Sequence, residues 1–156
     1  MELTWIVKSF NELSLQEMYD FMVLRQEVFV VEQDCPYLDC DGKDQLSHHV
    51  LGYNTNNELV AYTRLVKPNV SYTEVSIGRV ITAKKARKLG AGIALMTKSV
   101  NAMLKIYGNV AIRISAQCYL ERFYTSFGFI PTGKEYLEDG IPHMEMLRAA
   151  IGKIEL

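Results

Sequence analysis

The fold of this chain is decided by the stretch Ile77-Gly78-Arg79-Val80-Ile81-Thr82-Ala83-Lys84-Lys85-Ala86-Arg87-Lys88-Leu89-Gly90-Ala91-Gly92. Residues 77–82 predict a strand, and residues 84–92 form a turn with four basic residues and two glycines. Apolar residues at helical spacing follow directly, at Met96, Val100, Met103 and Tyr107. The stretch therefore places a basic turn at the start of a helix.

This turn is suited to binding an anion. The first amides of a helix have no backbone partners, and the helix dipole places about half a positive charge at that end. Gly90 and Gly92 let the backbone approach a ligand closely, and the four basic side chains add charge around it. A solvated basic turn that only caps the helix explains the same residues, so the turn alone leaves both interpretations open.

The rest of the chain alternates predicted strands and helices. Ser14 and Glu17 have the spacing of a capping box and predict a helix from there to about Val31. Gly108 ends the helix that follows the basic turn. Strands are predicted near residues 3–8, 49–53, 59–66, 74–82, 110–115, 130–132 and 143–147, with a long polar loop at 33–47 and a short helix at 119–126.

The composition favours one domain that spans residues 1–156. Hydrophobic residues make up 49% and charged residues 22%, which suits a chain that buries a core. The net charge of -1 offers no large positive field for nucleic acid. No run approaches the ~18 apolar residues of a membrane span, and the start of the chain lacks a basic segment followed by an apolar one. The 3 cysteines suit a reducing compartment, so we expect a cytoplasmic protein.

Two motifs resemble those of a known family. Residues 87–92 resemble the Arg/Gln-x-x-Gly-x-Gly/Ala signature of the GNAT acetyltransferase superfamily. Residues 117–129, from Gln117 through Tyr124 to Phe129, are similar to its Asn-x-x-Ala-x-x-Phe/Leu-Tyr-x-x-x-Gly-Phe segment. The two motifs stand in the family's order, and the first lies between a predicted strand and a predicted helix.

The resemblance implies a fold and a coenzyme. The fold is mixed α and β: a central, largely antiparallel twisted sheet that is splayed at the acetyl-CoA-binding strand, with helices on both faces. In that family the turn matching Arg87, Lys88, Leu89, Gly90, Ala91 and Gly92 wraps the coenzyme A pyrophosphate with backbone amides. The positions of Val80, Ile81 and Thr82 pair with the pantetheine arm, Gln117 stands where an Asn is common, and Tyr124 takes the position beside the thioester sulfur.

The resemblance is closest to the ElaA-like subgroup and extends nearly from end to end. It is carried by residues 25–37, Asp41-Gly42, residues 49–52 and residues 138–143. It implies acetyl transfer to an amine and leaves the acceptor unidentified.

Transfer to an amine requires a polarised carbonyl, a proton for the thiolate and a base. The resemblance implies that a backbone amide around Val80 polarises the carbonyl, and Tyr124 is the candidate acid because a phenol stays protonated at neutral pH. Glu74 and His49 are the candidate bases, and a chain of waters is an equal alternative.

Two acidic segments could attract a cationic amine. These are the loop with Asp39, Asp41 and Asp44, and the turn at Glu138-Asp139, although solvated turns are the simpler explanation of both. The acidic loop lacks the EF-hand pattern, and the cysteines and histidines lack zinc-finger spacing, so no metal is expected.

Competing functions remain open at this point. A non-catalytic acyl-CoA-binding or sensing module would share the fold. A nucleic-acid-binding domain would use the basic turn, but the net charge argues against it. The oligomeric state is open, a homodimer included.

Overall fold

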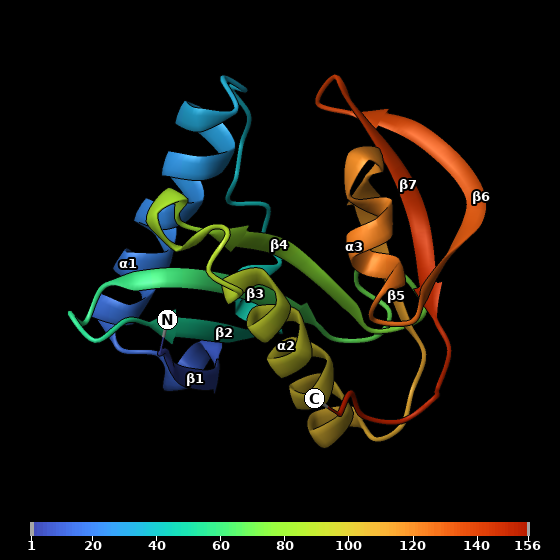
Figure 1. The fold of residues 1–156 in the computed structure, drawn as a ribbon, viewed down its shortest axis with the longest axis horizontal. Coiled ribbons are helices and arrows are strands. Elements are labelled where there is room, and N and C mark those ends of the chain that lie inside the picture. Colours follow the sequence, from blue (N-terminus) through green and yellow to red (C-terminus); the bar gives the residue numbers. More distant parts are fainter. Residues whose placement is uncertain (1, 156) are drawn as a thin grey trace.

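The computed structural model describes residues 2–155 (Figure 1). Its strands are β1 (Thr4–Ser9), β2 (Ser47–Tyr53), β3 (Leu59–Val66), β4 (Ser76–Thr82), β5 (Ile112–Gln117), β6 (Phe129–Glu138) and β7 (Ile141–Arg148). Its α-helices are α1 (Leu15–Arg25), α2 (Ala91–Tyr107) and α3 (Glu121–Thr125), and a π-helix follows α1 at Gln26–Glu32. Short 3-10 turns lie at Phe10–Glu12, Asp44–Leu46, Lys84–Ala86 and Cys118–Leu120.

The strands form two antiparallel sheets that diverge from each other. One sheet has the order β1-β2-β3-β4 and the other β5-β7-β6. Between β4 and β5, an isolated parallel bridge joins Val75 to Ile112, and the Arg113 amide donates to the Val75 carbonyl at 3.0 Å. Beyond this bridge the two strands part, and Figure 1 shows them leading into separate halves of the molecule. The expected splayed, largely antiparallel fold is confirmed.

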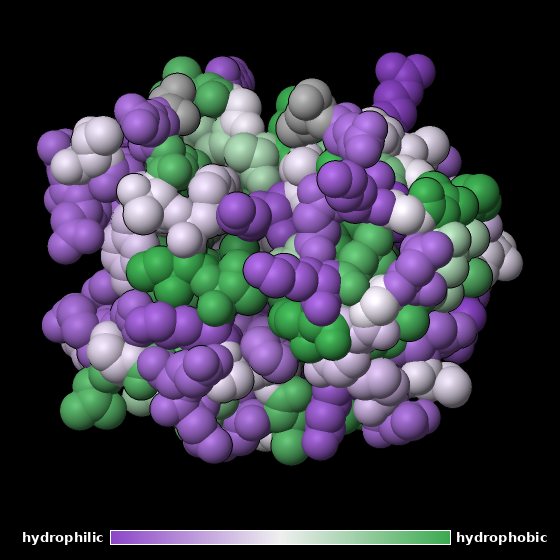
Figure 2. Space-filling view, turned by 90° about the horizontal axis from the view of Figure 1, so that it is seen from below, coloured by the Kyte–Doolittle hydropathy of each residue, from purple (hydrophilic) through white to green (hydrophobic). Residues whose placement is uncertain are grey.

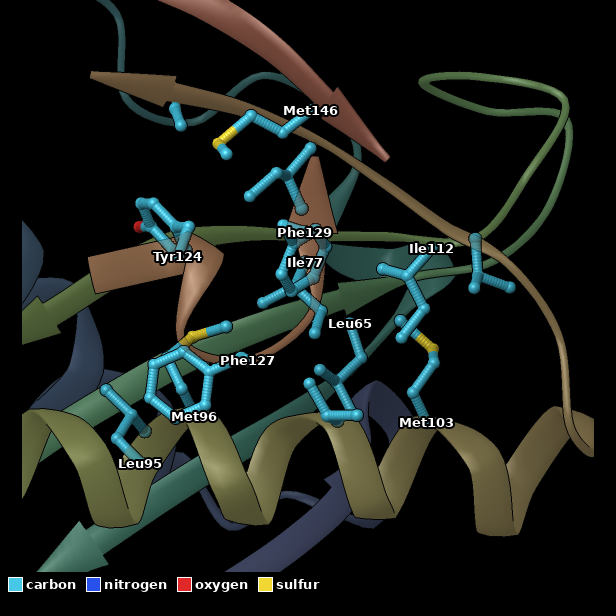
Figure 3. Close-up of a cluster of buried hydrophobic side chains, with 14 of the residues drawn as sticks. Leu65, Ile77, Leu95, Met96, Met103, Ile112, Tyr124, Phe127, Phe129 and Met146 are labelled. Atoms are coloured by element: carbon cyan, nitrogen blue, oxygen red, sulfur yellow. The ribbon is translucent and has the colours of Figure 1, made fainter. Parts of the chain in front are cut away.

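Helices cover both faces of the first sheet. On one face, Phe21 and Leu24 of α1 pack with Tyr62 and other buried side chains of the sheet. On the opposite face, Leu95 and Met96 of α2 belong to a larger cluster that continues into the second sheet. Figure 3 shows α2 side chains rising toward side chains from both sheets. The two halves therefore share one core beneath the point where the strands part.

Two elements differ from their predicted extents. The helix predicted from Ser14 to about Val31 is α-helical only to Arg25 and continues as a π-helix to Glu32. A π-helix has i→i+5 hydrogen bonds, so its side chains do not follow the 3.6-residue period that the prediction assumed. π-turns often occur at functional sites. The strand predicted near 130–132 is β6, which runs ten residues to Glu138. Most side chains of β6 are exposed, so its sequence lacks the alternation that marks a half-buried strand.

A buried cluster of charged residues joins the loop after the π-helix to the first sheet. We call it the Arg–Asp cluster; its members are Arg25, Arg64, Arg79, Asp39, Asp41 and Asp44. Its carboxylates accept hydrogen bonds of 2.7–3.4 Å from Arg25 and 2.8–3.0 Å from Arg64. Three cations face three anions, so the cluster carries no net charge.

The cluster corrects one expectation from the sequence. Asp39 and Asp44 are 6% and 8% exposed and bonded to arginines, so they are neither solvated nor free to attract an amine. Arg64 and Arg79 both contact Asp41, and arginine hydrogen bonds hold the pKa of this carboxyl well below its usual range. The acidic loop is therefore a structural segment, fixed to the helix and the sheet by ion pairs between its carboxylates and three arginines.

His49 lies beside this cluster, inside the first sheet. Its ring is fully buried and stacks on Phe21 at 4.9 Å. The Asp44 carbonyl can only accept, so His49 Nε2 donates to it at 3.0 Å, and Nδ1 accepts from the Tyr62 hydroxyl at 2.6 Å. Burial disfavours the imidazolium and lowers the pKa of His49 to about 4. Both ring nitrogens are therefore already used by the protein.

The surface contains mixed side chains on the face seen in Figure 2, where hydrophobic groups are interleaved with hydrophilic ones. None of the helices found within residues 2–155 has the length and apolar character to cross a bilayer.

Replacing Arg25 by Met should lower the free energy of unfolding by about 3–5 kcal/mol, because it leaves buried carboxylates without their partner. Urea denaturation at neutral pH measures the change. The matched control is Lys85→Met, which removes the exposed Lys85–Glu58 pair and should cost less than about 1 kcal/mol. Equal stability of the two variants would contradict a structural role for the cluster.

His49 should make stability depend on pH in a defined window. Its pKa is lower in the folded chain, at about 4, than the value near 6.5 of an unfolded chain, so below pH 6.5 the unfolded state binds more protons. The contribution is therefore complete above pH 6.5 and declines as the pH falls toward 4, by about 3 kcal/mol in total. Denaturation of wild type and His49→Gln between pH 5 and 7 should show a steeper loss in wild type, and equal slopes would contradict the assignment.

Candidate active site

A cavity of about 420 Å³ lies where β4 and β5 part. Its walls come from both halves of the molecule: β4, the end of the π-helix and the following loop on one side, and β5, α3 and the β6–β7 turn on the other. In Figure 1 these segments face one another across the divergence of the sheets. The fold thus places residues that are distant in the sequence around one space.

The edge of β4 that faces the cavity carries a β-bulge. The pairing with β3 shifts between Tyr62 and Arg64, so two residues of β4, Arg79 and Val80, lie opposite Thr63. Arg79 has a φ of +49°, a left-handed conformation that is unusual for a residue other than glycine. Its guanidinium bonds to Asp39, at 2.9 Å from Nε to Oδ1, and lies over the Tyr37 ring. The Arg–Asp cluster therefore holds the bulge in place.

The backbone groups of residues 80–82, predicted to bind the coenzyme, do not all face the same way. The Ala83 amide donates to Val60 of β3, and backbone groups alternate along a regular strand, so those of Thr82 face away from β3. Those of Ile81 face β3, with which it pairs through Tyr62. Val80 also lines the cavity. The sequence hypothesis assigns the polarising amide to this part of β4.

The basic turn has the geometry of an anion site. Lys88 and Gly90 have positive φ values, of +66° and +80°, and Gly90 caps α2. The first hydrogen bond of α2 runs from Ala94 to Gly90, so the three preceding amides point out of the helix end. A Cβ on Gly92 would lie 3.6 Å from Phe123, at ordinary contact distance. The free amides, rather than the lack of a side chain at Gly92, therefore favour an anion here.

The basic side chains of the turn are not equivalent. Arg87 pairs with Glu32 of the π-helix and donates to the Thr82 carbonyl at 3.0 Å. Lys85 pairs with Glu58 at 2.5 Å. Within the described residues, Lys84 and Lys88 make no ion pair. These two exposed lysines remain available to a phosphate, because Arg87 is paired with Glu32.

Tyr124 lies in the cavity wall, as the sequence hypothesis requires. It is 6% exposed, and its ring makes edge contacts with Phe123 and Phe129 at 5.2 and 6.2 Å. Its hydroxyl oxygen points away from the apolar cluster in Figure 3, and among residues 2–155 the hydroxyl makes no hydrogen bond. Burial raises the pKa of Tyr124, so the phenol is held in its protonated form. Gln117, at the end of β5, also lines the cavity.

The two carboxylate and imidazole candidates for the base lie elsewhere. Glu74 precedes β4 and forms a two-pronged pair with Arg113, at 2.9 Å to each of its oxygens. Those hydrogen bonds lower the pKa of Glu74 to about 2. His49 is enclosed between α1 and the sheet. Neither side chain is among those that line the cavity, so the structure does not bring the two candidates to Tyr124.

Other side chains also line the wall, and of these only Glu138 and Asp139 had a role assigned from the sequence, the attraction of a cationic amine. His143 and Tyr72 line the cavity, as do Arg79, Lys43 and the Glu138-Asp139 turn. His143 was visible only as part of the ElaA-like segment, and a lone histidine in a strand gives no local signal. Arg79 stands out in retrospect as a charged residue inside an apolar strand. No group of three or more metal-binding side chains occurs within residues 2–155.

Comparisons with known proteins agree with this architecture. The family model described as "Acetyltransferase (GNAT) domain" matches residues 12–149. A UPF0039 protein of Synechocystis is 45% identical over 147 residues, covering 94% of this chain and 96% of the relative. Protein ElaA of Escherichia coli is 43% identical over 143 residues, covering 90% and 93%.

A solved structure gives the same result in three dimensions. An acyl-CoA N-acyltransferase from Pseudomonas aeruginosa superposes with a TM-score of 0.89 at 39% identity, over 95% of this chain and all of the other. The chain belongs to the GNAT acetyltransferase family, in its ElaA-like subgroup.

Proposed function

We propose that residues 1–156 form a single cytoplasmic domain that transfers acetyl from acetyl-CoA directly to an amine of a small molecule or peptide. One observation carries the proposal: the free edge of β4 and the hydroxyl-bearing Tyr124 border the same cavity. The first can bind and polarise an acyl thioester, and the second can supply a proton to its sulfur. Family membership supports the acyl-transfer chemistry, and the geometry supports binding of the thioester and protonation of its sulfur at one site.

The coenzyme end of the site is the start of α2. The unpaired amides before Ala94, the helix dipole, and Lys84 and Lys88 together suit a pyrophosphate. The β4 edge leads from this end into the cavity, so an extended chain attached to the pyrophosphate can follow Val80 and the amide of Thr82, whose carbonyl already accepts from Arg87. Coenzyme A supplies the activated acyl group when bound there.

The chemistry then rests on two protein groups. The Val80 amide faces the cavity from a bulge that the Arg–Asp cluster fixes, so it can donate to a thioester oxygen without rearrangement. Tyr124 remains protonated because it is buried, and it can protonate the departing sulfur. Direct attack by the amine requires no acyl-enzyme, which is consistent with a wall that offers a tyrosine rather than an activated nucleophile.

Replacing Tyr124 by Phe should lower kcat by on the order of 100-fold, because the variant loses the proton donor. Turnover is read as free thiol release from acetyl-CoA against a panel of alkylamines, polyamines, amino-acid esters and a lysine-containing peptide. Calorimetry with coenzyme A should give an unchanged Kd. The matched control is Tyr19→Phe, a change on the exposed side of α1 that should leave kcat at the wild-type value.

Two results would contradict the proposal in different ways. Wild-type turnover that survives in Tyr124→Phe would remove the acid from the mechanism. Tight coenzyme A binding without turnover of any amine would support the non-catalytic acyl-CoA-binding module instead.

A further inference from the structure

The cavity lacks an assigned base, although it contains several ionisable side chains. Two arginines hold the pKa of Asp41 low, which makes its carboxylate a weak base. The Tyr37 hydroxyl donates a hydrogen bond to Asp39 at 2.6 Å. Burial raises the pKa of Tyr72, which disfavours the phenolate that a base would need. His143 is left as the one imidazole that lines the cavity among the described residues.

The two ring nitrogens of His143 have different surroundings. Nδ1 lies 2.7 Å from the carbonyl oxygen of Ile141, which can only accept, so Nδ1 carries a proton. Nε2 is consequently the nitrogen with the lone pair in the neutral ring. It lies 3.3 Å from a carboxylate oxygen of Glu138. A proton that arrives at Nε2 is therefore received beside a negative charge, in a ring whose orientation is already fixed.

The ring is also held by packing. His143 is 6% exposed and stacks on Tyr136, with ring planes 16° apart. The Tyr136 hydroxyl in turn donates to Ser115 of β5 at 2.5 Å. The Glu138 side chain is 53% exposed, so water screens its attraction for the imidazole.

His143 and Tyr124 approach the cavity from opposite faces of the β5–β7–β6 sheet. Met144 and Met146 of β7 pack in the same core as Tyr124 and α3. Side chains alternate along a strand, so His143 projects from the other face. On that face the β6–β7 turn meets the loop after the π-helix, where Cys35 Sγ lies 3.7 Å from the Asp139 carbonyl oxygen. The acyl carbonyl at β4 would lie between the two side chains.

We propose that His143 is the catalytic base of the acetyl transfer, with Glu138 as the residue that positions and stabilises its protonated form. This inference rests on the proposed N-acetyltransferase function. It also assigns the acceptor: a primary amine that enters as an ammonium ion from the side of the β6–β7 turn, toward the carboxylates of Glu138 and Asp139.

The step balances in protons and bonds. His143 Nε2 accepts one proton from the acceptor ammonium, and the neutral nitrogen attacks the thioester carbonyl carbon. The C–N bond forms, the C–S bond breaks, and the sulfur takes the proton of Tyr124. The amide nitrogen loses its second proton to water, water returns one to Tyr124, and His143 releases its own to solvent. The products are an N-acetylated amine, a free thiol and one proton.

Several other ionisable groups share the wall or sheet face with His143 and will shape its pH response. They are Glu138 and Tyr136 on β6, Asp139 in the turn, Glu145 on β7, Arg113 on β5, and Tyr72. Arg113 is paired with both Glu74 and Glu145, so its charge is largely compensated. Glu138 is the group within ion-pair distance of the imidazole.

His143→Gln, assayed with acetyl-CoA and the panel amine that wild type acetylates fastest, should lower kcat/KM at pH 7 by at least about 100-fold. The deficit should shrink as the pH rises toward 10, because free amine then forms without a base. Glu138→Gln should give a smaller loss and shift the acidic limb of the pH profile. The matched control is His48→Gln, a half-buried histidine against Tyr107 that should retain wild-type kcat/KM. Coenzyme A affinity and thermal unfolding should be unchanged in all three.

An NMR measurement tests the assignment without an acceptor. The chain has 3 histidines, so ¹⁵N spectra of the imidazoles give three assignable patterns. Nδ1 of His143 should keep its proton throughout the titration while Nε2 exchanges, and Glu138→Gln should alter that titration.

Three outcomes would overturn the inference. Wild-type rates and an unchanged pH profile in His143→Gln would remove its role while the proposed function stands. Loss of the proton from Nδ1 would contradict the geometry. Absence of turnover in wild type with every amine would overturn the proposed function, and the role of His143 with it.

Discussion

The separation of β4 from β5 is the constraint on which the rest of the structure depends. One parallel bridge, between Val75 and Ile112, holds the two strands together. Beyond it, the backbone groups of β4 that face away from β3 have no strand partner among the described residues. Unpaired groups on a strand edge must be satisfied by water or by a ligand. A coenzyme with an extended amide-bearing arm can pair with this edge, so the feature that interrupts the sheet also creates the proposed binding surface.

Keeping such an edge open and correctly shaped requires support from outside the sheet. Arg79 has a left-handed backbone, a conformation that costs of order 1–3 kcal/mol. Its side chain bonds to Asp39, which also binds Arg25 at the end of α1. The same contacts hold the loop after the π-helix against the cavity. The same buried ion pairs therefore hold the bulge, the loop and the end of the helix together, and in the proposed mechanism they fix the position of the Val80 amide.

The sequence predicted the parts of the site that are local and missed those that depend on pairing over distance. The strand, turn and helix of residues 77–92 are contiguous, so pattern and motif located them together. Asp39 and Asp44 looked like loop carboxylates because their partner, Arg25, lies 14 and 19 residues away on a helix. Glu74 and His49 had suitable chemistry for a base. Only the folded chain shows that Glu74 is paired with Arg113 and that His49 is buried beneath α1.

The alternation of side chains along β7 explains the proposed placement of the acid and the base. An acid and a base that touched each other would exchange a proton and lose their separate roles, whereas side chains on opposite faces of one sheet cannot do so. Met144 and the core around it separate Tyr124 from His143. In a transfer reaction the nucleophile and the leaving group approach the carbonyl from different directions, so the acid belongs on the side of the sulfur and the base on the side of the amine. A sheet that parts at β4 provides this, because it lets one cavity reach both faces.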